Sequence, residues 1–437
     1  MQQTCEAHRS PRQSVTILVA ALLFSVVACA TPAARNRVAE KREPSRALVA
    51  LPPTDHVDLR AREPMLAEAP DGSLYVSGYG EGYPVLWRST DGGVQWTRVL
   101  VGTAADGAVG NSDVDLAISA DGTIYLIVMM YDIAKEEGRG ITVGSSRDRG
   151  ASWRWTALSR DRFDDRPWIE VAPNGTAHAI WNDGQGVSHA VSTDRGLTWS
   201  ERSRVAPKGM SSHLAISPTG TIAVRITPLS ASANQFDAGI DSVAISADGG
   251  ASWTMRGLPG ARLWSAFDAR TPMLRWVEPI AWDSANALYS LWSEGTSLRL
   301  ARSSDRGASW TTVPVARGGD TLYFPYLIAR GNGELGMSWF SGRRTRVRAN
   351  VAHVRFEERL ADTLGAVPAH SYDFASFRRV YFGNLQRDTT DVTRERDTAG
   401  EYAALLFLRD GRLATVTTIQ DFARQRYGFT FRPYRIE

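Results

Sequence analysis

The amino-acid sequence predicts an all-β protein, folded as a β-propeller of seven four-stranded antiparallel blades. Three observations lead to this fold class: an octapeptide that recurs along the chain, seven apolar segments that each contain a tight turn, and the regular alternation of these two patterns. A four-stranded antiparallel unit takes about 40–50 residues, which suits a chain of 437 residues. Six blades plus an additional sheet are the alternative, because the segment from 357 to 400 is irregular.

The octapeptide follows the pattern Ser-x-Asp-x-Gly-x-x-Trp and occurs five times. Its aspartate can accept hydrogen bonds from backbone N–H groups, and its glycine supplies a backbone conformation with positive φ. Its tryptophan can bury a large ring between neighbouring sheets. These residues all serve one turn that repeats in each blade, so we expect them to be structural. They are Asp91, Asp148, Asp194, Asp248 and Asp305 with Trp96, Trp153, Trp199, Trp253 and Trp310.

The apolar segments between the octapeptides each predict a β-hairpin. In each one, two apolar runs flank a short turn, in most cases of the Asp-Gly or Asn-Gly kind. The seven segments are residues 65–79, 116–130, 169–181, 214–226, 280–292, 327–340 and 405–419. Each blade is therefore expected to consist of a hairpin, a third strand, the octapeptide and a fourth strand.

The N-terminus predicts a bacterial lipoprotein signal. Arg9 and Arg12 precede the apolar segment 15–28, which ends directly before Cys29, the position of a lipid-modified cysteine. An ordinary cleaved signal with a chance cysteine is the alternative. We expect an exported protein, periplasmic or at the cell surface, that contacts a bacterial membrane through an N-terminal lipid. The expected parts are a signal peptide (1–28), a lipidated flexible tether (29–46) and a single propeller domain (47–437).

Composition excludes several other classes of function. The formal net charge is only +3 and no basic stripe with interleaved aromatics stands out, which argues against nucleic-acid binding. Removal of residues 1–28 would leave one cysteine and no internal disulfide. The sequence holds no Gly-x-Ser-x-Gly elbow, no His-Glu-x-x-His motif and no phosphate-binding loop. We expect a monomer without a cofactor or a bound metal.

Polar residues precede the first strand of each expected hairpin, where the central channel of a propeller opens. Arginines there could hold a carboxylate through two hydrogen bonds, and a carboxyl group and a tyrosine could supply an acid and a nucleophile. The alternative is that these residues only solvate the channel mouth. The candidates are Arg62, Glu63, Asp113, Arg166, His213, Glu278, Tyr323, Glu401 and Tyr402.

The octapeptides resemble the Asp-box, or BNR repeat, of the sialidase superfamily, and the resemblance covers nearly all of residues 60–437. It implies that each box lies in the turn between the third and fourth strands, away from the mouth. The segment that begins at Arg62 resembles the sialidase segment that contributes the first arginine of a carboxylate-binding triad, with Glu63 in place of an apolar residue. The segment that begins at Glu401 resembles the one that carries the catalytic tyrosine, a position taken by Tyr402.

Other parts of the sialidase pattern are open in this sequence. The strand after the tyrosine segment, Thr-Val-Thr-Thr-Ile, lacks the glutamate that normally holds the first arginine, and sialidases have six blades rather than seven. Glu278 could activate the tyrosine. Candidates for the two further triad arginines are Arg166, Arg270 and Arg343, and candidates for the acid are Asp106 and Asp113.

Two functions follow from this pattern. The first is a sialidase-like exo-glycosidase or glycan-recognising propeller that acts on anionic sugars outside the cytoplasm. The second is a non-catalytic Asp-box propeller that binds a glycan, a peptide or a protein partner, because the fold alone does not decide the function.

Overall fold

The computed structural model describes residues 47–437 except 228, 231–234, 237–238, 260–262, 265–276, 344–345, 357–366, 374–399 and 422–423. These residues belong to one compact unit, Ser45–Glu437. The expected signal peptide, the tether with Cys29, and Arg270 lie outside the described residues.

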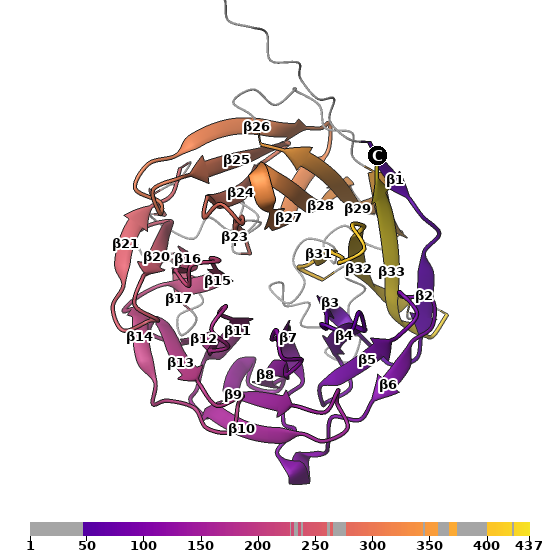
Figure 1. The fold of residues 1–437 in the computed structure, drawn as a ribbon, viewed down its shortest axis with the longest axis vertical. Helices are drawn as coiled ribbons and strands as arrows, with labels where there is room; N and C mark the ends of the chain where they lie inside the picture. The colour runs from indigo at the N-terminus through magenta and orange to yellow at the C-terminus, as the bar shows by residue number, and fades with distance from the viewer. Residues whose placement is uncertain are drawn as a thin grey trace, which may run out of the picture. The chain divides into compact units, whose positions relative to one another are not determined.

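The unit is a ring of seven antiparallel blades around a central channel, as predicted (Figure 1). In each blade the first strand lies innermost and the chain then runs outward, so that all inner strands enter the channel from the same face. The strands of the first four blades are β3 (Arg62–Glu68), β4 (Leu74–Tyr79), β5 (Val85–Ser89) and β6 (Thr97–Val99); β7 (Ser112–Ile118), β8 (Ile124–Asp132), β9 (Glu137–Ser146) and β10 (Arg154–Ser159); β11 (Asp164–Val171), β12 (Ala177–Asp183), β13 (Val187–Ser192) and β14 (Ser203–Ala206); and β15 (Met210–Ile216), β16 (Ile222–Thr227), β20 (Ser242–Ser246) and β21 (Thr254–Gly257).

Blades 5 and 6 repeat the same order, and two short ladders lie in the insertions of blade 4. Blade 5 consists of β23 (Ile280–Trp282), β24 (Leu288–Glu294), β25 (Ser297–Ser303) and β26 (Thr311–Arg317), and blade 6 of β27 (Thr321–Arg330), β28 (Glu334–Arg343), β29 (Arg346–Arg355) and β30 (Val367–Asp373). The ladders pair β17 (Leu229–Ser230) with β18 (Gln235–Phe236), and β19 (Gly239–Ile240) with β22 (Leu263–Trp264). The helical turns among the described residues are η1 (Ala104–Asp106) and η2 (Gly331–Gly333), and no described helix is long and apolar enough to cross a membrane.

Blade 7 combines both ends of the ring. Its strands β31 (Leu405–Phe407), β32 (Leu413–Asp421) and β33 (Arg426–Ile436) come from the C-terminus, and β1 (Leu48–Ala50) and β2 (Thr54–Val57) pair with β33 on its outer side. Leu48 lies opposite Ile436, and Thr54 opposite Phe431. The first described strands therefore close the ring against the last one.

The octapeptides form the turns between the third and fourth strands of blades 1 to 5. In the box of blade 5, the Ser303 hydroxyl donates to Asp305 Oδ1 at 2.8 Å and accepts from the Gly307 N–H at 2.7 Å, while the Ser309 N–H donates to the same Asp305 oxygen at 2.8 Å. Gly307 has a φ of 83°, which a side chain would strain. The Trp310 indole donates to the Gly307 carbonyl at 3.2 Å. Each group of the box is thus used within its own turn.

The box tryptophans also join neighbouring blades. Trp96 of blade 1 lies 5.1 Å from the ring of Phe429 and 5.5 Å from that of Phe431, both on β33 of blade 7. Trp253 of blade 4 packs at 5.5 Å against His189 of blade 3. Apolar contact between adjacent sheets is the main force that holds a propeller closed, and the boxes contribute to it from the rim.

Candidate functional site

Five inner strands shift register where they enter the channel, and three of them do so at a bulge that contains a proline. The pairing of β3 with β4, of β11 with β12 and of β27 with β28 shifts register between Arg62 and Met65, Asp165 and Trp168, and Tyr323 and Tyr326, respectively. In each bulge the residue before a proline has a positive φ: 47° at Glu63, 47° at Arg166 and 46° at Phe324. Such a conformation costs a non-glycine residue about 1–3 kcal/mol and is concentrated at functional sites. Bulges re-aim side chains, and here they do so at the channel mouth.

The mouth brings oppositely charged groups from blades 1, 3 and 7 into contact. Arg166 Nη2 lies 3.0 Å from Glu401 Oε2, and its Nε lies 3.9 Å from Asp165 Oδ2. Glu63 Oε1 accepts a hydrogen bond of 3.0 Å from the backbone N–H of Glu401. The Arg166 side chain is only 7% exposed, whereas Asp165 and Glu401 are 28% and 24% exposed. The two carboxyl groups therefore remain within reach of a ligand.

Arg62 is the second guanidinium of the mouth. It lies over the Tyr79 ring, 5.4 Å from the ring centre. Burial acts to lower the pKa of Arg62, but the negative charges around it, including those of Glu63 and Asp113, raise it above the ordinary value. Arg62 therefore stays protonated and is held by anionic groups of the protein itself.

The carboxyl groups of the mouth hold their protons more tightly than usual. Burial, together with repulsion from Glu401 and Asp113, raises the pKa of Glu63 to about 8. Burial raises the pKa of Asp165 to about 7, against the lowering effect of Arg166. The pKa of Glu401 is also raised, chiefly by burial. Near neutral pH, Glu63 and Asp165 can therefore either donate or accept a proton.

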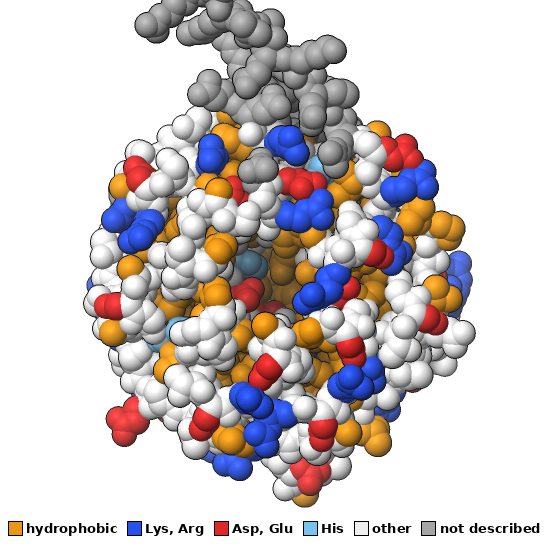
Figure 2. Space-filling model, viewed as in Figure 1, with side chains coloured by type: hydrophobic (Ala, Val, Ile, Leu, Met, Phe, Trp, Pro, Cys, Tyr) orange, Lys and Arg blue, Asp and Glu red, His pale blue; other side chains and the backbone are white. Residues whose placement is uncertain are grey.

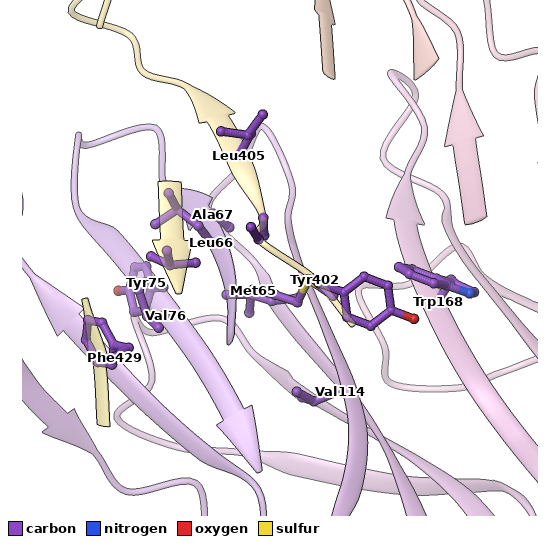
Figure 3. Close-up of a cluster of buried hydrophobic side chains, with 14 of the residues drawn as sticks. Met65, Leu66, Ala67, Tyr75, Val76, Val114, Trp168, Tyr402, Leu405 and Phe429 are labelled. Carbon is purple, nitrogen blue, oxygen red and sulfur yellow. The ribbon is translucent and has the colours of Figure 1, made fainter. Parts of the chain in front are cut away.

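A row of aromatic rings crosses the channel beside this charged group. The rings of Tyr402 and Trp168 lie 5.4 Å apart, those of Trp168 and His213 4.8 Å, and those of His213 and Tyr326 5.5 Å. Tyr402 belongs to blade 7 and Trp168 to blade 3, which are not neighbours, so their contact spans the channel (Figure 3). The space-filling view shows a hollow at the centre of the ring that contains acidic, histidine and hydrophobic side chains (Figure 2).

A second pair of carboxyl groups follows further along the same strands. Asp115 accepts hydrogen bonds from the Ile169 and Leu116 N–H groups at 2.9 and 2.8 Å, and burial raises its pKa to about 8. Burial by the surrounding protein raises the pKa of Glu170 to about 7, although its side chain is open to solvent in the channel. Burial also raises the pKa of Tyr326 and lowers that of His213 to about 4, so His213 is neutral.

Most of the residues expected at the mouth interact there. Arg62, Glu63, Arg166 and Glu401 do so through the contacts above, and Asp113 through its charge. Tyr402 and His213 belong to the aromatic row, with Tyr402 only 5% exposed. The expected residues of blades 1 to 4 lie within the inner strands, because these strands begin earlier than the hairpin pattern indicated, whereas Glu401 and Tyr402 precede β31.

The remaining candidates lie elsewhere or are not described. Glu278 is fully buried between blades 4 and 5, where it forms an ion pair with Arg225. Tyr323 is 1% exposed and packs against the rings of Phe324 and Phe340. Asp106 is exposed and caps η1 by accepting from the Thr103 N–H and hydroxyl, both at 2.8 Å. Arg343 ends β28, but its side chain is not described.

Sequence analysis missed Asp165, Trp168, Tyr326 and Tyr79 as members of this site. Asp165 and Trp168 flank Arg166 and Pro167, where the strand bulges. Pro167 was the feature of the sequence that could have indicated this bulge and the two residues beside it. Among the described residues, no group of three or more His, Cys, Asp or Glu side chains is placed to hold a metal ion.

Comparison with known proteins places the chain by its fold. The sequence matches no protein-family model and no curated protein. Among solved structures, YCF48 from Cyanidioschyzon merolae aligns with a TM-score of 0.51 at 12% identity, covering 88% of this chain and 98% of that one. The fold is a sialidase-like β-propeller. An identity this low shows likeness of fold alone. The turns between the third and fourth strands lie where the Asp-box resemblance implied.

Two carbohydrate-active enzymes also align with this sialidase-like propeller. An ulvan lyase, a polysaccharide lyase bound to its saccharide, has a TM-score of 0.49 at 10% identity and covers 87% of this chain and 95% of that one. The sialidase of Trypanosoma rangeli bound to sialic acid has a TM-score of 0.44 at 12% identity and covers 87% of this chain and 58% of that one.

Proposed function

We propose that the channel mouth binds the end of a glycan and hydrolyses its terminal glycosidic bond. The observation that carries this proposal is the gathering of acidic groups with pKa values near neutrality, Glu63 and Asp165, beside Arg166, Glu401 and Tyr402. Perturbed carboxyl groups in a concave site are characteristic of acid–base catalysis.

The aromatic row favours a glycan end over the middle of a chain. The contacts of Trp168 with Tyr402 and of His213 with Tyr326 join blades that are not neighbours, so the rings obstruct passage through the channel. A saccharide that enters the mouth would stop at the rings, with one sugar unit among the charged groups. This arrangement supports an exo-acting enzyme.

Asp165 is the group best suited to donate the proton. It is 28% exposed and its pKa is raised to about 7, so a substantial share of the molecules carry the proton at neutral pH. In the proposed step, Asp165 protonates the leaving oxygen while the bond from that oxygen to the anomeric carbon breaks. A positioned acid of this kind contributes about 10²–10⁴-fold to the rate.

Tyr402 is the proposed nucleophile, by its resemblance to the sialidase tyrosine. Burial raises its pKa well above 10, and the charges of Glu401 and Glu63 raise it further, against the effect of Arg166. The phenol therefore has to pass its proton to one of these carboxylates as its oxygen bonds to the anomeric carbon. Water would then displace the tyrosine oxygen from the anomeric carbon. The Asp165 carboxylate takes the proton of the water, and the carboxyl group that holds the phenol proton returns it to Tyr402.

The test is release of product from a panel of fluorogenic glycosides with cationic, neutral and anionic terminal sugars, sialosides included. We expect Tyr402→Phe and Asp165→Asn to abolish most of the turnover, and Tyr83→Phe, at a tyrosine that contacts Arg98 outside the mouth, to leave it unchanged. An inert wild-type protein, or full turnover in both mouth variants, would contradict the proposal.

A non-catalytic glycan-binding propeller is the second candidate. It is favoured by the position of Tyr402, which is only 5% exposed and so offers a ligand little of its hydroxyl. This candidate is supported if a glycan binds saturably and no glycoside in the panel is hydrolysed.

We also propose that the propeller acts outside the cytoplasm, held at a bacterial membrane by a lipid on Cys29. The support is the apolar segment 15–28 directly before this cysteine. In a bacterial host, the wild-type protein should incorporate labelled fatty acid and sediment with membranes, and Cys29→Ser should do neither. Unchanged sedimentation and labelling of Cys29→Ser would contradict the proposal.

A further inference from the structure

We infer that the terminal sugar recognised by the mouth carries a positively charged amino group and no carboxylate. This inference rests on the proposed function and names the substrate class of the same site. It departs from the anionic sugar that the sialidase resemblance implies, and it follows from the way in which the charges of the mouth are already paired.

Among the residues that the structure describes, the mouth contains more carboxyl groups than guanidinium groups. Glu63, Asp113, Asp165 and Glu401 act on one another by their charges, while Arg62 and Arg166 are the guanidinium groups placed among them. Arg166 is 3.0 Å from Glu401, and Arg62 lies in the field of Glu63 and Asp113. A carboxylate ligand would have to displace a carboxylate of the protein from its arginine and would face the remaining ones.

The neighbouring carboxyl groups already repel each other without a ligand. After burial, repulsion by Glu401 and Asp113 contributes to the raised pKa of Glu63, and the same two groups contribute to that of Asp165. A further negative charge would add to this repulsion, whereas an ammonium group would relieve it, because opposite charges within a few ångströms in a partly buried site attract strongly.

The site also offers a hydrogen-bond donor to an oxygen of the same ligand. The indole Nε1 of Trp168 is buried and has no hydrogen-bond partner among the described residues, although nearly all buried polar groups are paired in folded proteins. An ammonium beside Asp165 and Glu401, with a hydroxyl oxygen on the Trp168 indole, describes an amino sugar.

Binding of such a sugar should release protons from the protein. An ammonium group lowers the pKa of the carboxyl groups around it, so Glu63 and Asp165 lose protons on binding at pH 7. The heat of binding should therefore differ between two buffers of different ionisation enthalpy. A sugar without charge should produce a smaller release or none.

The experiment is titration calorimetry of the full-length protein at pH 7 with D-glucosamine, D-glucose and D-glucuronic acid. We expect glucosamine to bind at least about 10-fold more tightly than glucose, equivalent to about 1.4 kcal/mol, and glucuronic acid to bind most weakly. Glu401→Gln removes the carboxylate paired with Arg166. This variant should reduce or invert the difference in affinity between glucosamine and glucuronic acid. Glu201→Gln, at an exposed carboxyl group outside the mouth, is the matched control and should leave the order intact.

The outcomes separate the inference from the function on which it rests. Tighter binding of glucuronic acid than of glucosamine, or an order that Glu401→Gln leaves unchanged, would overturn the inference but leave glycan binding standing. If none of the three sugars binds and no glycoside is hydrolysed, the proposed function fails with it.

Discussion

Carboxylates at the rim of the propeller and at its mouth have opposite surroundings. At the rim, the pKa of Asp305 falls to about 2, because the Ser309 hydroxyl and N–H and the Ser303 hydroxyl all donate to it. At the mouth, burial and neighbouring carboxylates raise the pKa of Glu63 to about 8. The rim aspartates Asp148, Asp194 and Asp248 repeat the pattern of Asp305, each with a pKa of about 2.

This difference separates carboxylates that stabilise a turn from carboxylates that remain available to a ligand in a repeat protein. A group whose acceptor capacity is filled by its own turn has no capacity left for a ligand, however often it recurs. A carboxylate that is held close to other carboxylates is repelled by them, and a bound cation or a proton can reduce this repulsion. Four substitutions test this contrast.

The largest effect is expected from Asp165→Asn at the mouth. Loss of the proton donor should lower kcat by about 10²–10⁴-fold for a glycoside with an alcohol leaving group, and less for a phenol that leaves without protonation. Because the acid must carry its proton, kcat/KM of the wild type should fall as the pH rises through about 7. Steady-state kinetics from about two pH units below this pKa of about 7 to about two units above it check both points. Equal loss for both leaving groups would argue against a proton-donating role.

Glu63→Gln should change the pH dependence of stability. The folded pKa of Glu63, about 8, lies above its ordinary value of 4.5, so its contribution to stability is fully present below 4.5 and is lost as the pH rises through 8. The loss can reach about 5 kcal/mol, since each pKa unit corresponds to about 1.4 kcal/mol. Glutamine retains an acceptor for the Glu401 N–H. Denaturant unfolding should therefore show a flatter pH profile for the variant, and parallel profiles would refute the assignment.

Glu278→Gln tests whether this residue belongs with the mouth or with the core. Glu278 and Arg225 are 0% and 1% exposed and form an ion pair, with Asp241 at 3.5 Å from the same guanidinium nitrogen. Breaking a buried ion pair typically lowers the free energy of unfolding by about 3–5 kcal/mol. Because Asp241 still faces the Arg225 guanidinium, we expect a decrease near the smaller of these values. We expect a lower free energy of unfolding with kcat of the folded fraction unchanged. A selective loss of kcat at full stability would instead support the role of tyrosine activator.

The smallest effect is expected from Asp305→Asn at the rim. Asparagine keeps an acceptor for the Ser309 N–H but loses the charge, so the midpoint of thermal unfolding should fall slightly and activity should not change. The folded pKa of Asp305 lies below the ordinary value, so its contribution is present above about 3.8 and is lost as the pH falls toward 2. The difference between variant and wild type should shrink over that acid range. Loss of activity at pH 7 would contradict the separation of rim and mouth.

The fold could be predicted because the information for each blade is local. The Ser, Asp, Gly and Trp of a box bond to one another within eight residues, as Ser303 to Trp310 show, so the sequence alone marks the turn. The closure of blade 7 could not be read in this way. β1 and β2 are short, and their partner β33 lies at the other end of the chain.

The site could be predicted by position but not by orientation. The mouth residues of β3 and β11 were found because every inner strand enters from the same face. Asp165 and Trp168 were missed because a bulge changes which side chains face the channel, and only Pro167 hints at that bulge. Glu278 precedes a proline as Glu63 does, yet β23 begins only at Ile280, and Glu278 instead meets Arg225.

The pairing of β1 and β2 with β33 has a consequence for how the chain is made. A polypeptide emerges from its N-terminus, so these two segments must wait, with unpaired edges, until β33 has been synthesised. Every earlier blade can assemble in order behind them. Until β33 has been synthesised, the nascent ring is open. The unpaired edges of β1 and β2 are then a surface to which a chaperone or a second incomplete copy of the chain can bind.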